Sequence, residues 1–527
     1  MTEDITSRIW DVIVIGTGMG GGTVGRRLAE KSLSVLFVEK GAAGKRAEAQ
    51  GIDAAIADPF ARSLHGYWPM PVTAQLNGKP TEFFAPLGAG VGGSSVFYAA
   101  ALERPEPHDL DDSPERPHPT GGWPVSHAQF RPYFAEAERM FEVSGTPDPL
   151  SPDAPGPLKP PPPIPPGDAA LLERLRGAGL NPYRGHLALR NLPGCANCLG
   201  RKCPRDCKMD GRSAGVEPAL ATGRAALLDH AEVRALRGSR NRISHVEVRR
   251  GGETLALKAR AYVLAAGALA SPLLLMASKS EHWPDGCAND SGLVGRNLMF
   301  HLTEMFALWP GRRDPGAGAA KGIALRDHYY RDGTRFGMVQ AMGISASYGE
   351  ILHFLNLQFD RSPLAGIRPL RHLMRLPAGI AANLFGSAAL FAGILEDLPY
   401  RTNRVLPGPG DPLALNFTYD FAPELLARRR RFRAAINRSL RGQARLFLNR
   451  APEPNFGHAS GTLSFGNDPA TSVLNPECRA HSIRNLHVAD ASFMPTSTGV
   501  NPSLLIAANA LRVADHLAET LQEGGLP

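Results

Sequence analysis

Four cysteines stand close together in "CANCLGRKCPRDCK", residues 195–208. The four are Cys195, Cys198, Cys203 and Cys207. Thiolates at such short spacings, here C-x2-C-x4-C-x3-C with a proline nearby, can hold an iron–sulfur cluster. They could also form a closed zinc site, although zinc usually takes its ligands as two separated pairs, or they could be structural thiols or disulfides. The residues alone leave all three alternatives open.

A glycine-rich turn near the N-terminus has the spacing of a dinucleotide-binding motif. In "GTGMGG", Gly16, Gly18 and Gly21 follow the strand-like "DVIVIG" and open a helical stretch. The first glycine permits a tight turn, the second lets a pyrophosphate approach the backbone, and the third lets helix and strand pack closely. Glu39 ends the next strand, where a carboxylate binds ribose hydroxyls and repels a 2′-phosphate. The motif predicts a βαβ unit that binds FAD or NAD rather than NADP.

Further stretches indicate how the elements around these residues are organised. Residues 232–265 alternate like a small antiparallel sheet, and residues 300–455 mix strand-like and helical stretches as a second domain would. Residues 377–395 form an uncharged apolar run after three arginines. This run predicts one helix, which is either buried or a substrate lid, or else lies on an anionic membrane or a partner. Residues 424–447 are rich in arginine and predict a helix with a solvated face.

Length and composition exclude several classes of protein. A chain of 527 residues predicts two or three domains, and 43% hydrophobic with 20% charged residues is typical of a folded, soluble protein. The net charge of +8 comes from arginines that are spread widely, which argues against nucleic-acid binding and suits an anionic membrane or an acidic partner better. The opening "MTEDITSRIWDVIVIG" shows no export signal, so we expect a cytoplasmic protein, with peripheral membrane contact as an alternative.

Four further stretches together resemble the glucose-methanol-choline (GMC) flavin oxidoreductases. They are "GAGVGGSSVFYAAALERPEPHD", "AYVLAAGALASPLLLMAS", "GLVGRNLMFH" and some sixty residues that begin at "HASGT" and include "GVNPS". With the glycine motif they run from residue 11 to 517 in the order of that family. The resemblance selects FAD over NAD.

The resemblance implies an α/β fold in which a Rossmann-like FAD-binding domain is assembled from discontinuous segments and accompanied by an α+β substrate domain with an antiparallel sheet. The FAD-binding segments are expected at residues 1–115, 191–300 and 455–527. Residues 116–190 would connect them and contribute to the substrate domain, and residues 301–454 would form most of that domain.

The resemblance also assigns the residues of the flavin site. The expected cofactor-binding residues are Gly16, Gly18, Gly21, Glu39, Gly92, Gly93, Ser94, Val233, Ala266, Gly267, Asp490, Asn501 and Pro502. Some relatives carry a histidine after "GGSS" that bonds to the flavin, but Val96 stands here, which predicts non-covalent FAD. Tyr98 occupies a position where many relatives have asparagine.

His458 and Asn501 fall on the catalytic positions of the family. Oxidation of an alcohol requires a base near the hydroxyl, and histidine suits this role because its ordinary pKa is near 6.5. His458 is expected to take the hydroxyl proton, Asn501 to hydrogen-bond the same oxygen, and flavin N5 to take the hydride. His108, His301 and His481 are expected to be structural or surface residues.

The subclass depends on the electron acceptor. The cysteine loop is similar to one that holds an iron–sulfur cluster in sugar dehydrogenases of the family, which favours a dehydrogenase that passes electrons to a protein or quinone. An oxidase that reduces dioxygen is the alternative, and a flavin electron-transfer subunit without alcohol oxidation is a further one. The cysteine spacing points to a sugar as substrate and the apolar residues 377–395 to an apolar alcohol, so the substrate class stays open.

Overall fold

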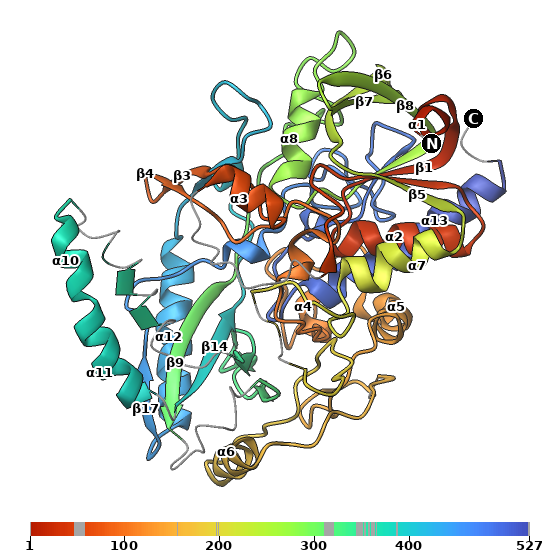
Figure 1. Ribbon diagram of the computed structural model, residues 1–527. Coiled ribbons are helices and arrows are strands. Elements are labelled where there is room, and N and C mark those ends of the chain that lie inside the picture. Colours follow the sequence, from red (N-terminus) through yellow and green to blue (C-terminus); the bar gives the residue numbers. More distant parts are fainter. Residues whose placement is uncertain are drawn as a thin grey trace.

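The computed structural model describes residues 2–46, 58–154, 156–195, 198, 200–309, 321–343, 351–352, 355–356, 359, 364, 366–385 and 388–524. Two large sheets with their covering helices form the framework of the fold (Figure 1). The two ends of the described chain lie close together beside the first sheet (Figure 1).

The first sheet has seven strands in the order β5-β2-β1-β8-β7-β6, with β18 also paired to β8. Its strands are β1 (Ile9–Ile15), β2 (Val35–Val38), β5 (Ala225–Leu228), β6 (Glu232–Ser239), β7 (Arg242–Arg250), β8 (Glu253–Leu264) and β18 (Leu486–Val488). β5, β2, β1, β8 and β18 pair in parallel, whereas β6, β7 and β8 pair antiparallel. The antiparallel part confirms the alternation in residues 232–265.

Helices cover this sheet and connect its distant segments. They are α2 (Met19–Glu30), α5 (His127–Met140), α7 (Glu217–Ala221) after a π-helical turn (Gly211–Val216), α8 (Ala270–Ala277) and α13 (Ser503–Gln522). The guanidinium of Arg27 on α2 contacts the carboxylate of Asp515 on α13, with Nε and Oδ1 2.8 Å apart. Short elements elsewhere are α1 (Thr2–Ser7), α3 (Pro59–Leu64), α4 (Pro107–Leu110) and α6 (Pro166–Gly177).

The second sheet is antiparallel in all its pairings and has the order β10-β13-β14-β9-β17. Its strands are β9 (Leu302–Trp309), β10 (Ala324–Leu325), β13 (Val339–Ala341), β14 (Ala389–Leu395) and β17 (Ala444–Phe447). Helix α12 (Pro423–Ser439) packs against it, and the core between them contains Phe306, Phe391 and Phe432. The predicted fold class, a Rossmann-like domain with an α+β substrate domain, is therefore confirmed.

Two smaller sheets complete the fold. A four-stranded sheet joins β3 (Val72–Leu76) and β4 (Lys79–Phe83) to β15 (Arg404–Val405) and β16 (Asn416–Tyr419), and β11 (Tyr330–Arg331) pairs with β12 (Thr334–Arg335). Because β3 pairs with β16, the segment before residue 115 shares a sheet with residues 404–419. The predicted domain boundaries themselves stay a prediction.

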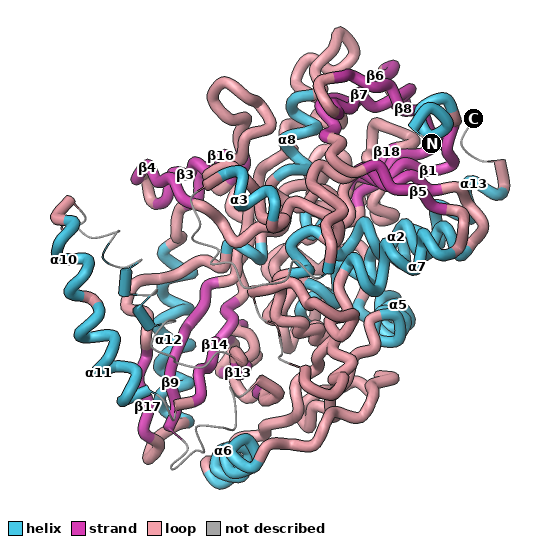
Figure 2. The backbone as a smooth tube through the Cα atoms, viewed as in Figure 1, coloured by secondary structure: helices cyan, strands magenta, loops and turns pink. Residues whose placement is uncertain are grey.

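The prediction of one helix over residues 377–395 was wrong. Helix α11 (Arg375–Phe385) follows α10 (Arg368–Leu373), and the apolar run then enters strand β14 (Figure 2). β14 is buried along its whole length because β13 and β9 pair with both of its edges. The first part of the run is thus apolar as part of a surface helix, and its last part is apolar because it forms a central strand. No helix in the described part of the chain is long and apolar enough to cross a membrane.

The prediction of a helix with a solvated face over residues 424–447 was also wrong in part, because α12 ends at Ser439 and Ala444–Phe447 form strand β17. On α12 the side chains of Arg428 and Arg429 are buried. Arg429 and Arg433 both contact the carboxylate of Glu304, whose side chain is fully buried on β9. Arg429 and Arg433 therefore attach α12 to the second sheet.

Replacing Glu304 tests this attachment. Glu304→Gln leaves two cations at the buried face of α12 without their carboxylate, a change that typically destabilises by about 3–5 kcal/mol. We expect a clearly lower thermal unfolding midpoint, measured by circular dichroism. The control is Glu173→Gln, which breaks an exposed pair with Arg176 and should shift stability by less than about 0.5 kcal/mol. Equal midpoints for the two variants would contradict a stabilising role for the Glu304 cluster.

Candidate functional site

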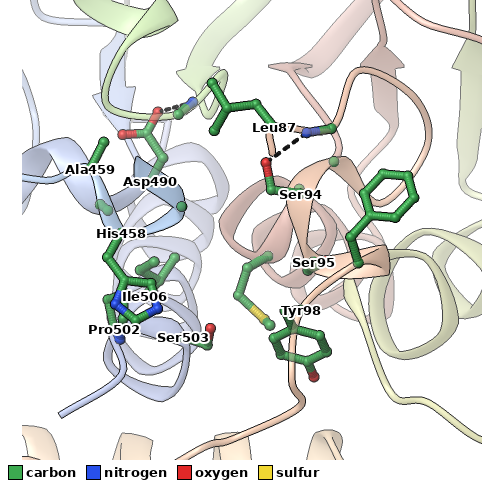
Figure 3. A pocket seen from close by; sticks show the side chains of 18 of the residues that line it. Leu87, Ser94, Ser95, Tyr98, His458, Ala459, Asp490, Pro502, Ser503 and Ile506 are labelled. Atoms are coloured by element: carbon green, nitrogen blue, oxygen red, sulfur yellow. Dashed lines mark hydrogen bonds between the residues drawn. The ribbon is translucent and has the colours of Figure 1, made fainter. Parts of the chain in front are cut away.

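One cavity of about 540 Å³ connects both ends of the predicted site. Its wall includes Glu39 and Val233 at one end, Gly16 and Gly18 between, and His458 at the other. Figure 3 shows the part of the pocket around His458. His458 lies with Pro502, Ser503 and Ile506 on one side, and Ser94, Ser95 and Tyr98 lie opposite. Segments that are distant in the sequence therefore share one pocket.

The glycine turn between β1 and α2 brings backbone to the pocket wall. Gly16 has a φ of +95°, and a Cβ there would lie 2.5 Å from the carbonyl oxygen of Ala265. Gly18 is the N-cap of α2, and a Cβ on Gly93 would lie 2.9 Å from the Gly18 Cα, so two glycine loops meet here. The N-terminus of α2 opens beside this meeting point and presents free N–H groups and a positive dipole end, as a phosphate requires.

Glu39 closes the end of the pocket after β2. Its carboxylate accepts hydrogen bonds from the Thr17 hydroxyl at 2.5 Å, the Thr17 amide at 3.2 Å and the Gly41 amide at 3.0 Å. Burial raises the pKa of Glu39, while these hydrogen bonds and Lys40 lower it. The carboxylate is therefore fixed in place on the wall next to Val233, where a ribose would lie.

The serine-rich loop after Gly92 forms the opposite wall. Gly92 has a φ of +95° and precedes a 3₁₀ turn, Gly93–Val96. The hydroxyl of Ser94 accepts a hydrogen bond from the Gly88 amide at 3.0 Å, and that of Ser95 accepts one from the Gly211 amide at 2.9 Å. These bonds hold the loop against neighbouring backbone.

Asp490 organises the third side of the pocket. It caps a 3₁₀ turn, Ala491–Phe493, and accepts hydrogen bonds from the amides of Gly267 and Ser492, each at 2.9 Å; Figure 3 shows one dashed bond to its carboxylate. The hydroxyl of Ser271 donates to the same carboxylate at 2.5 Å. Because the chain itself occupies these acceptor positions, Asp490 mainly fixes the strand ends after β8 and β18.

His458 lies in a second 3₁₀ turn, Phe456–His458, that Asn455 caps through a bond from the Gly457 amide at 3.1 Å. Its Nδ1 lies 2.9 Å from Nδ1 of His301, and Nε2 of His301 lies 2.9 Å from the carbonyl oxygen of Thr498. Burial lowers the pKa of His301 to about 4 and holds that of His458 well below 6.5. Both rings are therefore neutral near pH 7.

His301 is thus a site residue that the sequence analysis missed, since it was expected to be structural or on the surface. Its only sequence signal is its place at the end of "GLVGRNLMFH". Asn501 lies on the pocket wall near His458, and its buried Oδ1 has no hydrogen-bond partner in the described part of the chain.

Most of the predicted cofactor-binding residues line the pocket. Those on its wall are Gly16, Gly18, Glu39, Gly93, Ser94, Val233, Ala266, Gly267, Asp490, Asn501 and Pro502. Gly21 and Gly92 do not line it. A Cβ on Gly21 would lie 2.1 Å from the Gly16 carbonyl oxygen, so this glycine allows α2 to pack on the turn.

The four cysteines lie behind the pocket wall rather than on it. The Sγ atoms of Cys195 and Cys207 are 3.2 Å apart, and Lys208 donates to the carbonyl oxygens of Val96 and Tyr98 at 3.1 and 3.2 Å. Gly200, inside the cysteine loop, reaches the pocket. Across the residues that the structure places, no three His, Cys, Asp or Glu side chains form a group that could hold a metal ion. The geometry therefore gives no support to the predicted iron–sulfur cluster.

Three curated proteins are similar to this chain over nearly its whole length. The 6'''-hydroxyparomomycin C oxidase of Streptomyces lividus is 31% identical and the alignment covers 97% of this chain and 92% of the relative. The paromamine 6'-oxidase of Streptomyces fradiae is 29% identical, with 98% and 92% covered. The 2-methyl-1,2-propanediol dehydrogenase of Mycolicibacterium austroafricanum is 28% identical, with 97% and 96% covered.

Solved structures share the fold. The pyridoxine 4-oxidase of Mesorbium loti superimposes with a TM-score of 0.62 at 21% identity and covers 96% of this chain and 99% of its own. A variant of the formate oxidase of Aspergillus oryzae RIB40, studied for its FAD modification, gives 0.67 at 16% identity and covers 99% and 100%. Family profiles described as GMC oxidoreductase match residues 11–303 and 419–510. The chain therefore belongs to the GMC oxidoreductase family, whose named members include oxidases and dehydrogenases that act on alcohols.

Proposed function

We propose that this enzyme binds FAD non-covalently and oxidises the CH–OH group of a small alcohol or sugar to a carbonyl, with His458 as the base. The observation that carries this proposal is the single pocket that joins the glycine turn and Glu39 to His458 and Asn501. A dinucleotide cradle and a base at opposite ends of one cavity are what such a reaction needs.

The residues of the cradle fit FAD. The approach of Gly93 to Gly18 leaves no room for a side chain, so backbone there can face a pyrophosphate directly. Glu39 would hold the ribose hydroxyls, and Val96 offers no atom for a covalent bond to the flavin. FAD, when bound, supplies the hydride acceptor.

The hydrogen bonds of His301 define which nitrogen of His458 is the base. The Thr498 carbonyl oxygen can only accept, so Nε2 of His301 carries a proton and the neutral ring has a bare Nδ1. That Nδ1 accepts from Nδ1–H of His458, which leaves Nε2 of His458 unprotonated. His301 is a positioning residue: it fixes the tautomer and orientation of the base.

Asn501 completes the arrangement. Its amide lines the pocket on the same side as His458 and makes no hydrogen bond that would occupy Oδ1. Oδ1 can only accept, and the single alcohol proton goes to His458, so the NH₂ group of the amide is the part that can bind the alcohol oxygen. We infer that Nδ2–H of Asn501 donates a hydrogen bond to the alcohol oxygen while Nε2 of His458 takes its proton.

For the acceptor we propose a protein or quinone rather than dioxygen. The oxidase names of two relatives support dioxygen as a second candidate, and the dehydrogenase name of another supports the first. An iron–sulfur relay is not part of the proposal, and the contact between Cys195 and Cys207 supports a bracing role for the cysteine loop. Reoxidation of the reduced enzyme by dioxygen and by a dye, compared at equal concentration, decides between the acceptors.

Variants of the two histidines test the base. His458→Ala should slow anaerobic flavin bleaching by the alcohol by about 10²–10⁴-fold, since the proton acceptor is lost. His301→Leu should slow it by about 10- to 100-fold, because His458 loses its fixed tautomer and orientation. His301→Gln should restore part of the rate, because an amide can accept from His458 and donate to Thr498. Undiminished bleaching in His458→Ala would refute the assignment.

The pH dependence tests the protonation state. Only neutral His458 can accept a proton, and its pKa is lowered by burial and by His301. The neutral form therefore persists as the pH falls towards 6.5, and kcat/KM should decrease on the acid side only below about pH 6.5. An acid limb above pH 7 would mean that His458 is not the group that titrates, or is not held neutral.

The cradle is tested separately through FAD affinity. Glu39→Gln keeps the shape of the side chain but removes the charge that strengthens hydrogen bonds to the ribose, so FAD should dissociate roughly tenfold more readily. The recovery of flavin fluorescence on release measures this. Glu82→Gln, at an exposed position on β4, is the matched control. An unchanged dissociation constant for Glu39→Gln would place the ribose elsewhere.

A further inference from the structure

We propose that α10 and α11 form a docking face that rests on the surface of an anionic lipid bilayer. The docking face consists of Ile367, Leu373, Leu376 and Ile380 with the basic side chains of Arg371 and Arg375. This inference adds an interaction surface to the enzyme and does not depend on its reaction.

Exposed apolar side chains are concentrated on this face. Eleven large hydrophobic side chains are exposed in the described part of the chain, and five of them lie between residues 364 and 380. Single exposed apolar residues are normal on a protein surface, but a contiguous group marks an interaction site. This concentration, in α10, α11 and the residues just before α10, therefore calls for a partner that covers it.

Helix α11 has a buried side and an outward side. Ala378 is fully buried, and the ring of Phe385 packs 5.2 Å from that of Trp309 at the end of β9. Leu376 and Ile380 are 70% and 64% exposed. They are four residues apart, so they share one face of the helix. Figure 1 shows α10 and α11 at the edge of the molecule, far from the seven-stranded sheet and both ends of the chain.

The charge around the docking face selects the partner. Residues 361–395 contain no Asp or Glu, whereas Arg371, His372 and Arg375 are exposed among the apolar side chains. A symmetric contact with a second copy would bring like charges together, which is unfavourable. Anionic headgroups instead attract the arginines while the acyl boundary takes the leucine and isoleucine side chains. With 11 residues, α11 can lie on a bilayer but not cross it.

The docking face lies beside the second sheet, where the ring of Phe385 on α11 packs against that of Trp309. Strand β14 begins at Ala389, a few residues after α11 ends, and its Ala392 and Ile394 line the pocket. A bilayer bound at the docking face would therefore lie next to the second sheet and away from the FAD cradle.

Co-sedimentation with lipid vesicles tests the proposal on the full, FAD-loaded chain. The protein should pellet with vesicles that contain phosphatidylglycerol in phosphatidylcholine, and should bind pure phosphatidylcholine vesicles at least about tenfold more weakly. Raising the salt to about 0.5 M should weaken the binding to the anionic vesicles, since it screens the arginines.

Variants locate the contact. The double variant Leu376→Glu, Ile380→Glu should bind anionic vesicles at least about tenfold more weakly, because it removes apolar side chains and adds negative charge. Leu150→Glu, at an exposed leucine elsewhere, should bind as the unchanged protein does. Matching unfolding midpoints and flavin absorbance would show that both variants are folded.

Three outcomes would overturn the proposal: no vesicle binding by the unchanged protein, equal binding by the double variant, or a dimer in light scattering that the double variant dissociates without any vesicle binding. The last would assign the face to a second copy. Flavin bleaching by a soluble alcohol reports on the proposed function separately, because vesicle binding requires no turnover.

Discussion

The arrangement depends on the close approach of three backbone turns at the carboxyl ends of parallel strands. A Cβ on Gly16, in the turn after β1, would lie 2.5 Å from the carbonyl oxygen of Ala265, which follows β8, and a Cβ on Gly93 of the serine-rich loop would lie 2.9 Å from the Gly18 Cα. β18 ends beside β8, so Asp490 can hold the amide of Gly267. A side chain at Gly16 or Gly93 would therefore separate the turns. The pocket exists because backbone packs against backbone here.

The proposed proton transfer takes place at the end of the pocket that His458 lines. His301 lies just before β9, where the chain has left the first sheet. His458 lies after β17, where the chain returns towards the first sheet. The two rings meet where the chain enters and leaves the second sheet. Burial keeps both neutral, and the Thr498 carbonyl oxygen determines the order of donors and acceptors. In the proposed reaction, this one backbone oxygen thereby sets which nitrogen of His458 faces the substrate.

Local patterns predicted the parts of the structure that are themselves local. The βαβ unit with Gly16, Gly18 and Glu39 is a contiguous motif, and its geometry follows from strand and glycine chemistry. The meeting of His301 with His458 joins residues far apart in the chain, so no spacing could show it. The apolarity of residues 377–395 predicts a helix, but it is equally typical of a central strand such as β14. Likewise, the arginine-rich sequence of α12 predicts a solvated face, because Glu304 on β9, which binds two of these arginines, is distant in the chain.

The central claim is that His458 presents an unprotonated Nε2 to the pocket while its Nδ1–H donates to His301. Neutron diffraction from crystals of the deuterated protein near pH 7 would locate these hydrogens directly. The account predicts deuterium on Nδ1 of His458 and on Nε2 of His301, with none on Nε2 of His458. Deuterium on Nε2 of His458, whether in a neutral ring or an imidazolium, would contradict it.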